Sequence, residues 1–95
     1  MKDRRMTPDL AATLALNALA FLAASEDAMQ RFMDLTGAGR ESLRERADEP
    51  EFLASVLDFL LTNEGLLLDF SSETSTDVRA VHMARHILSG EPSDA

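Results

Sequence analysis

The chain has 95 residues, 45% of them hydrophobic and 27% charged, no cysteine, and a formal net charge of -8 at pH 7. That length and apolar content suit one soluble domain with an ordinary core, and the lack of cysteine excludes disulfides, thiolate metal sites and cysteine nucleophiles. The negative charge opposes binding to nucleic acids and anionic membranes, which both present phosphates. We expect an acidic, cytoplasmic domain over residues 1–95, disordered at 1–6 and 91–95.

The first predicted helix covers residues 7–24. Thr7 suits the N-cap, Pro8 the first helical position and Asp9 the first turn, where its charge faces the positive end of the helix dipole. Basic residues before the apolar run also suggest a secretory signal, but polar residues interrupt the run at helical spacing. The run is also too short to span a bilayer. A structural helix is therefore the preferred interpretation.

This helix has two apolar faces, separated by a narrow polar strip of Thr13 and Asn17. The face expected to enter the core contains Leu10, Leu14, Ala18, Phe21 and Leu22. The second face contains Ala12, Leu16, Ala20 and Ala23. Alanine favours helix and lets another backbone approach closely. The second face is covered either by the rest of the domain or by a partner, and we predict that it contacts a protein partner or forms a homodimer.

Two shorter helices are expected next. Ser25 is the predicted N-cap of the second helix, and Gly37 is its predicted C-cap. The buried face of that helix is expected to contain Ala28, Met29, Phe32, Met33 and Leu35. The charged segment at residues 40–47 has an acidic start and a basic end, which suits a surface helix anchored by Leu43.

The stretch at residues 51–70 holds three of the five phenylalanines and most of the large aliphatic side chains. In residues 52–61 the apolar arc exceeds half the helix circumference, which is typical of a helix covered on several sides. We predict a central helix here. Its cap is either Asp48, through a capping box, or Glu49 followed by proline. Asn63 is expected to cap a following short helix.

The polar run at residues 71–77 predicts a loop in which Ser75 or Thr76 caps the last helix. The core face of that last helix is expected to contain Ala80, Val81, Ala84, Ile87 and Leu88. Its outward face is expected to contain Arg79, His82, Arg85 and His86. No strand-like alternation occurs, so the fold class is all-α, a compact single-domain bundle of five to six short helices.

The sequence offers weak signals for metal or catalytic chemistry. His82 and His86 lie four residues apart, a spacing that can place two imidazoles on one metal, but such sites need three or four ligands. The acidic groups at residues 48–51, 58 and 69 are explained as caps and solvated faces. A nucleophile elbow and a phosphate loop are both missing. We expect no enzyme activity, no catalytic residue, no cofactor and no metal site.

A helix-turn-helix is the most tempting functional fold, with residues 65–73 as the reading helix. That segment has no Arg, Lys, Asn or Gln for bases or phosphates, and it carries two acids. Nucleic-acid binding is rejected.

Three stretches carry a family resemblance, namely LALNALAFLA at 14–23, RFMDLTG at 31–37 and FLASVLDFLLTNEGLLLDF at 52–70. The chain resembles a family of small alphaproteobacterial proteins of similar length that is grouped as a domain of unknown function. The resemblance covers nearly the whole chain and implies an all-helical cytoplasmic domain. It transfers no catalytic or binding residue.

The sequence therefore favours a non-enzymatic helical protein that acts through protein contacts, with self-association through residues 7–24 as one form. The alternative is a bundle that binds a small apolar ligand between the first helix and the central pair of helices. A metal-binding protein is the third interpretation.

Overall fold

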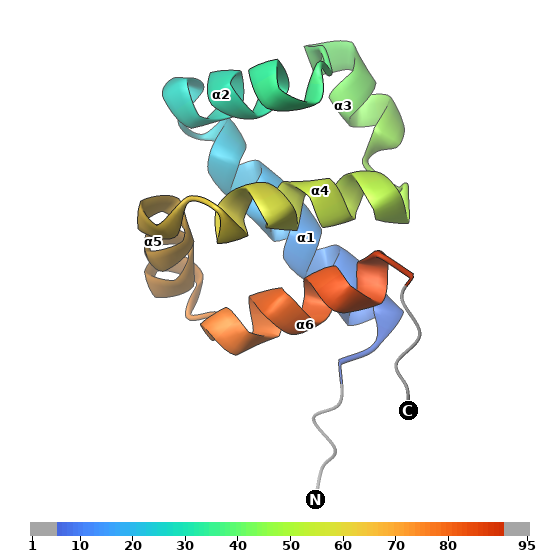
Figure 1. Ribbon diagram of the computed structural model, residues 1–95, viewed down its shortest axis with the longest axis vertical. Coiled ribbons are helices and arrows are strands. Elements are labelled where there is room, and N and C mark those ends of the chain that lie inside the picture. The colour runs from blue at the N-terminus through green and yellow to red at the C-terminus, as the bar shows by residue number, and fades with distance from the viewer. Residues whose placement is uncertain (1–5, 91–95) are drawn as a thin grey trace, which may run out of the picture.

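Six α-helices account for most of residues 6–90, the part of the chain that the computed structural model describes (Figure 1). They are α1 (Pro8–Ala23), α2 (Glu26–Thr36), α3 (Arg40–Arg46), α4 (Pro50–Leu61), α5 (Glu64–Thr74) and α6 (Val78–Leu88). No strand occurs among these residues, so the all-α bundle is confirmed. Of the ends expected to be disordered, residues 1–5 and 91–95 lie outside the described part, while Met6 packs half-buried against the core.

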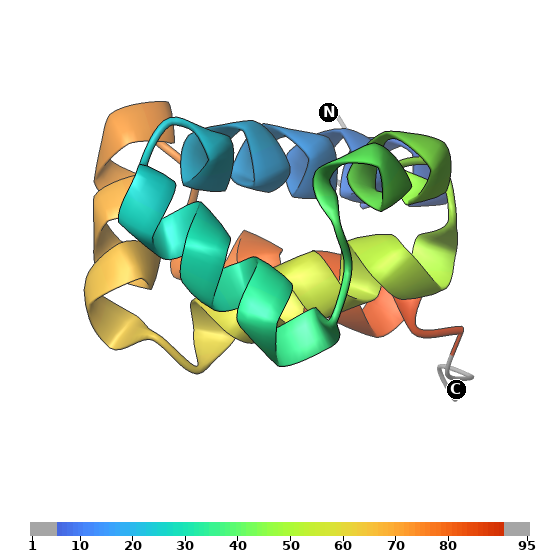
Figure 2. The same cartoon turned by 90° about the horizontal axis from the view of Figure 1, so that it is seen from above.

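Helices α1, α4 and α6 pack against one another and form the centre of the molecule. Figure 2 shows α1 on one side with α4 and α6 on the other, and α3 on the same side as α1. Seven of the twelve residues of α4 are buried, while Ser55 and Asp58 face partly outward. The predicted central helix is confirmed, because its wide apolar arc is covered by α1 and α6.

The face of α1 that enters the core overlaps the predicted face only in part, at Ala18 and Leu22. Its buried residues are Ala11, Ala15, Ala18 and Leu22. Of the larger side chains assigned to the core, Leu10 is 55% exposed, and Leu14 and Phe21 are half-buried. The prediction was therefore correct for Ala18 and Leu22 and wrong for Leu10, and it did not include Ala11 and Ala15 in the core face. Two helices lie against α1 on this side, and the small alanine methyl groups let their backbones come close.

Phe32 of α2 packs edge-on against Phe52 and Phe59 of α4, with ring centroids 5.9 and 5.5 Å away. Aromatic pairs favour this arrangement because the positive ring edge meets the negative ring face. Leu35, predicted to be buried with Phe32, is instead 70% exposed. It lies in the last turn of α2, on a side that no other described helix covers.

Several helix caps that were predicted from the first half of the sequence are confirmed. The Thr7 hydroxyl accepts a hydrogen bond from the Leu10 amide, and the Ser25 hydroxyl accepts one from the Ala28 amide. Gly37 ends α2 with a φ of 75°, in the left-handed region that glycine enters without strain. Of the two caps considered for α4, the structure has Glu49, with Pro50 as the first helical residue.

The segment at residues 71–77 was predicted to be a loop, but α5 continues through it to Thr74. Side chains stabilise this extra turn, since the Thr74 hydroxyl donates to the Phe70 carbonyl and the Ser71 hydroxyl donates to the Thr76 carbonyl. Ser75 is the C-cap of α5, and Asp77 caps α6 by accepting a hydrogen bond from the Arg79 amide. The predicted caps at Ser75 and Thr76 were therefore wrong.

Between Met6 and Gly90, no single helix is both long enough and apolar enough to cross a bilayer. Only α1 and α2 taken together reach that length and composition, and they turn by 116° at their junction.

Candidate protein-contact surface on the first helix

The four residues predicted to contact a partner lie in one continuous stripe along α1, which we call the outer face: Ala12, Leu16, Ala20 and Ala23. Leu16 is 43% exposed, Ala20 and Ala23 are exposed, and Ala12 is half-buried. The rest of the described chain leaves most of this stripe uncovered. The sequence allows the outer face to be covered either by the rest of the domain or by a partner. Its exposure largely excludes cover by the rest of the domain.

The outer face lies in a segment without charge. No Asp, Glu, Lys or Arg occurs from residue 10 to residue 24, although the chain as a whole has a net charge of -8. Like charges repel over roughly 10 Å at physiological ionic strength. The outer face is therefore a region where a second acidic surface can approach without direct repulsion.

Beside the outer face lies a half-open hollow of about 460 Å³ between α1, α2 and α3. Its apolar lining consists of Leu19, Ala23, Met29, Leu43 and Ala47, and its charged lining consists of Glu26, Arg40 and Arg44. Ala23 belongs both to the hollow and to the outer face, so the two features are contiguous. The sequence predicted α3 and its anchor Leu43 but not this hollow, because the position of α3 beside α1 depends on tertiary packing.

The two arginines of the hollow differ from Arg31 and Arg46 in lacking an acidic partner among the described residues. Arg31 pairs with Asp27 at 3.5 Å, and Arg46 pairs with Glu49 at 3.3 Å. Within residues 6–90, Arg40 and Arg44 form no ion pair and are exposed. Since Glu26 is the single acid lining the hollow, the lining itself carries one more positive than negative charge.

A ligand site between α1 and the central pair of helices was the alternative prediction. That space holds packed side chains, including Phe21 of α1 edge-on to Phe70 of α5 with ring centroids 5.5 Å apart. Ala15, Ala18 and Leu57 there have no exposed surface. The hollow beside α3 lies in a different place from the predicted ligand site.

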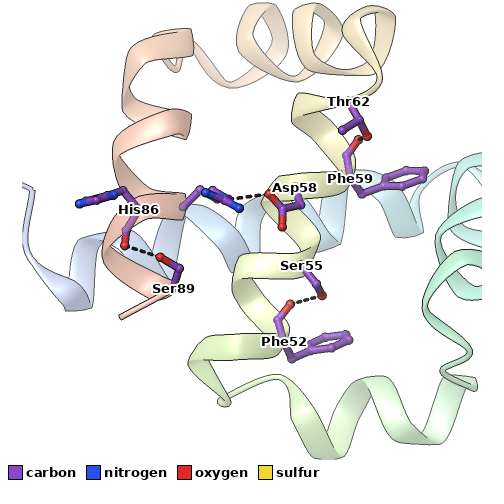
Figure 3. Close-up of polar contacts among 8 residues, drawn as sticks. Phe52, Ser55, Asp58, Phe59, Thr62, His86 and Ser89 are labelled. Carbon is purple, nitrogen blue, oxygen red and sulfur yellow. Dashed lines mark hydrogen bonds and ion pairs between the residues drawn. The ribbon is translucent and has the colours of Figure 1, made fainter. Parts of the chain in front are cut away.

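His82 and His86, the weak candidates for metal ligands, are both exposed on α6. Figure 3 shows His86 pointing away from Asp58, which faces α6 from α4. Among residues 6–90, no group of three or more His, Cys, Asp or Glu side chains could hold a metal ion. Arg85, predicted to face water, is half-buried and donates through Nε to Asp58 Oδ1 at 2.5 Å.

Residues 8–91 match the family described as "Protein of unknown function (DUF3572)". The chain belongs to this family. Membership confirms the predicted kinship with a domain of unknown function that covers nearly the whole chain. No curated protein and no solved structure matches the chain.

The outer face and the hollow both fall inside the part of the chain that matches DUF3572. They are formed by residues 12–47, which belong to the first three helices. The candidate contact surface is therefore part of the family domain itself and not of a flanking segment.

Proposed function

We propose that this DUF3572 protein is not an enzyme and acts through protein–protein contacts made by the outer face of α1. One observation carries the proposal, namely that an uncharged apolar stripe centred on Leu16 stays exposed on a chain with a net charge of -8. Exposed apolar surface bordered by polar residues is typical of interaction sites.

The chemistry of the sequence supports a contact function over a reaction. No nucleophile elbow, phosphate loop or thiol is present in the 95 residues. We infer a cytoplasmic location from the lack of cysteine, and the absence of nucleic-acid and membrane partners from the acidic charge. An alphaproteobacterial origin stays a prediction from the resemblance.

A single substitution in the middle of the outer face tests the proposal. Leu16→Glu puts a charge where a partner is expected to remove water, so self-association by light scattering or recovery of a partner from the native cell should be lost. Leu35→Glu is the matched control, because Leu35 is an equally large exposed residue on α2.

Both variants should keep the helical circular dichroism signal of the parent, since neither side chain is in the core. A strictly monomeric protein whose partner recovery is unchanged by Leu16→Glu would rule out this surface.

A second candidate is binding of a small apolar ligand in the hollow between α1, α2 and α3. Its volume of about 460 Å³ and its lining of Leu19, Met29 and Leu43 favour this candidate. Ligand sites commonly measure 300–1,000 Å³, although they are usually more enclosed. Leu43→Glu, at a half-buried position in the lining, should then abolish the fluorescence increase of an apolar dye, and an unchanged increase would exclude the hollow.

Metal binding by His82 and His86 is the weakest candidate, because the described part of the chain supplies no third ligand beside them. Calorimetric titration with zinc tests it, and heat no larger than that of weak imidazole binding would exclude it.

A further inference from the structure

We propose that the partner of the outer face is a second copy of this chain, packed antiparallel on α1 about a two-fold axis at Leu16. Asp9 of each copy then lies against Arg40 and Arg44 of the other. The inference rests on the proposed contact function and adds the partner, the orientation and the register.

The spacing of residues along α1 determines how the two copies align in the proposed dimer. Five residues of α1 follow one another at intervals of three, four, four and three, which read the same from either end. They are Asp9, Ala12, Leu16, Ala20 and Ala23. At about 100° per residue, all five lie within a single quarter of the helix circumference. A two-fold interface brings the same surface of both copies together, so residue i contacts j wherever j contacts i. This stripe has that symmetry.

With the axis at Leu16, the two leucines meet at the centre and each Ala12 lies opposite Ala20 of the other copy. The exposed leucine supplies the apolar surface that becomes buried. The alanines on either side let the two helix backbones approach, as Ala15 and Ala18 do on the core side of the same helix.

The same register places Asp9 of one copy opposite Ala23 of the other. Ala23 borders the hollow that Arg40 and Arg44 line, and α3 lies on the same side of the molecule as α1 (Figure 2). Asp9 is exposed and, like the two arginines, forms no ion pair within residues 6–90. Within the lining of the hollow, Glu26 opposes the approach of Asp9 and the two arginines attract it. The acids Glu41 and Glu45 lie elsewhere on α3.

The distribution of charge around the outer face is compatible with a second copy as the partner. Two chains with net charges of -8 repel except where their surfaces are uncharged or complementary. The outer face provides the uncharged centre, and Asp9 with the arginine-lined hollow provides complementary ends. In the two-fold arrangement the contact between Asp9 and the arginines forms twice, once at each end of the interface. Every group that this contact requires is present on this chain.

The expected dimer is weak. Helix α1 has 16 residues and is therefore about 24 Å long, so its outer face and the rim of α3 bury less than a standard interface of about 800 Å² per partner. We expect dissociation in the micromolar range and further weakening at high salt.

Two charge-reversed variants and their mixture test the inference by sedimentation equilibrium. Asp9→Arg alone and the pair Arg40→Asp with Arg44→Asp alone should each raise the dimer dissociation constant by about tenfold or more, because both ends then repel. Mixing the two variants should restore dimers to within about threefold of the parent, because both ends of the mixed dimer attract. A local structural role for these residues cannot produce this recovery.

The controls separate charge at the interface from charge elsewhere and from folding. Asp69→Arg on α5 makes the same charge change as Asp9→Arg, and Arg79→Asp on α6 makes the charge change of one of the two arginine substitutions. Both positions are exposed and lie outside the outer face, so both controls should leave dimerisation unchanged. Asp9→Asn removes the charge without reversing it and should weaken the dimer less than Asp9→Arg. Circular dichroism of every variant should match the parent, since none of these residues is buried.

The outcomes distinguish this inference from the proposed function. The register would be wrong if Leu16→Glu dissociated the dimer while the charge reversals had no effect, or if the mixture of variants stayed monomeric. The outer face would remain the contact surface in either case. A parent protein that stays monomeric up to about 1 mM would overturn the second copy as partner. The contact function would then survive only if Leu16→Glu, and not Leu35→Glu, abolished recovery of another protein.

Discussion

At the residue scale, alanine sets how closely α1 approaches its neighbours. Ala11, Ala15 and Ala18 have no exposed surface, and they form the side of α1 that faces α4 and α6. A larger side chain at any of these positions requires the helices to move apart or adopt strained rotamers. Ala20 lies on the opposite side of α1 and is exposed.

A pair of matched substitutions tests this difference. Ala15→Leu should lower the free energy of unfolding by about 1–3 kcal/mol, because the buried site has no room for three more carbon atoms. Ala20→Leu should change it by less than about 0.5 kcal/mol, because the side chain extends into solvent. Urea denaturation at low protein concentration measures both, and equal losses would show that α1 is packed in another orientation.

At the element scale, helix ends follow from short sequence signals. Thr7, Ser25 and Gly37 were predicted as caps and act as caps, because each depends on hydrogen bonds or backbone angles within a few residues. The end of α5 was not predictable in this way. Serine and threonine suit both loops and final helical turns, and the choice at residues 71–74 depends on hydrogen bonds across the following turn.

Gly37 offers a test of the turn between α2 and α3. Gly37→Ala should cost about 1 kcal/mol of unfolding free energy, because its φ of 75° strains a residue that has a Cβ. Gly39→Ala is the control. Gly39 has a φ of -94°, and nothing lies within 4 Å of a Cβ placed there, so a change below about 0.5 kcal/mol is expected by thermal denaturation. Equal losses would indicate that the αL turn is not formed.

The element faces show why the candidate site was predicted only in part. The periodicity of α1 placed Leu16 and its alanine neighbours on a second apolar face, but it left open whether the rest of the domain covers that face. The hollow could not be predicted from the sequence, because it forms only where α3 lies beside α1 and α2. No local signal in residues 40–47 specifies that position of α3. Leu35 was misplaced for the same reason, since its exposure depends on where neighbouring helices end.

At the scale of the whole molecule, the two sides of α1 have different surroundings. The small residues on the inner side of α1 hold α4 and α6, and the uncharged stripe on its other side stays accessible. The remaining surface carries the strong negative charge that keeps acidic copies apart in other orientations. A contact made through α1 is therefore restricted to one surface of the domain.

The mass of the unmodified protein as a function of concentration shows whether the outer face of α1 binds a second copy. Sedimentation equilibrium should show a shift from the chain mass of 10.4 kDa toward twice that value as concentration rises through the micromolar range. Leu16→Glu should remain at the chain mass under the same conditions, while Leu35→Glu follows the parent. A parent that stays at 10.4 kDa at every concentration, or a Leu16→Glu variant that dimerises as the parent does, would contradict the account.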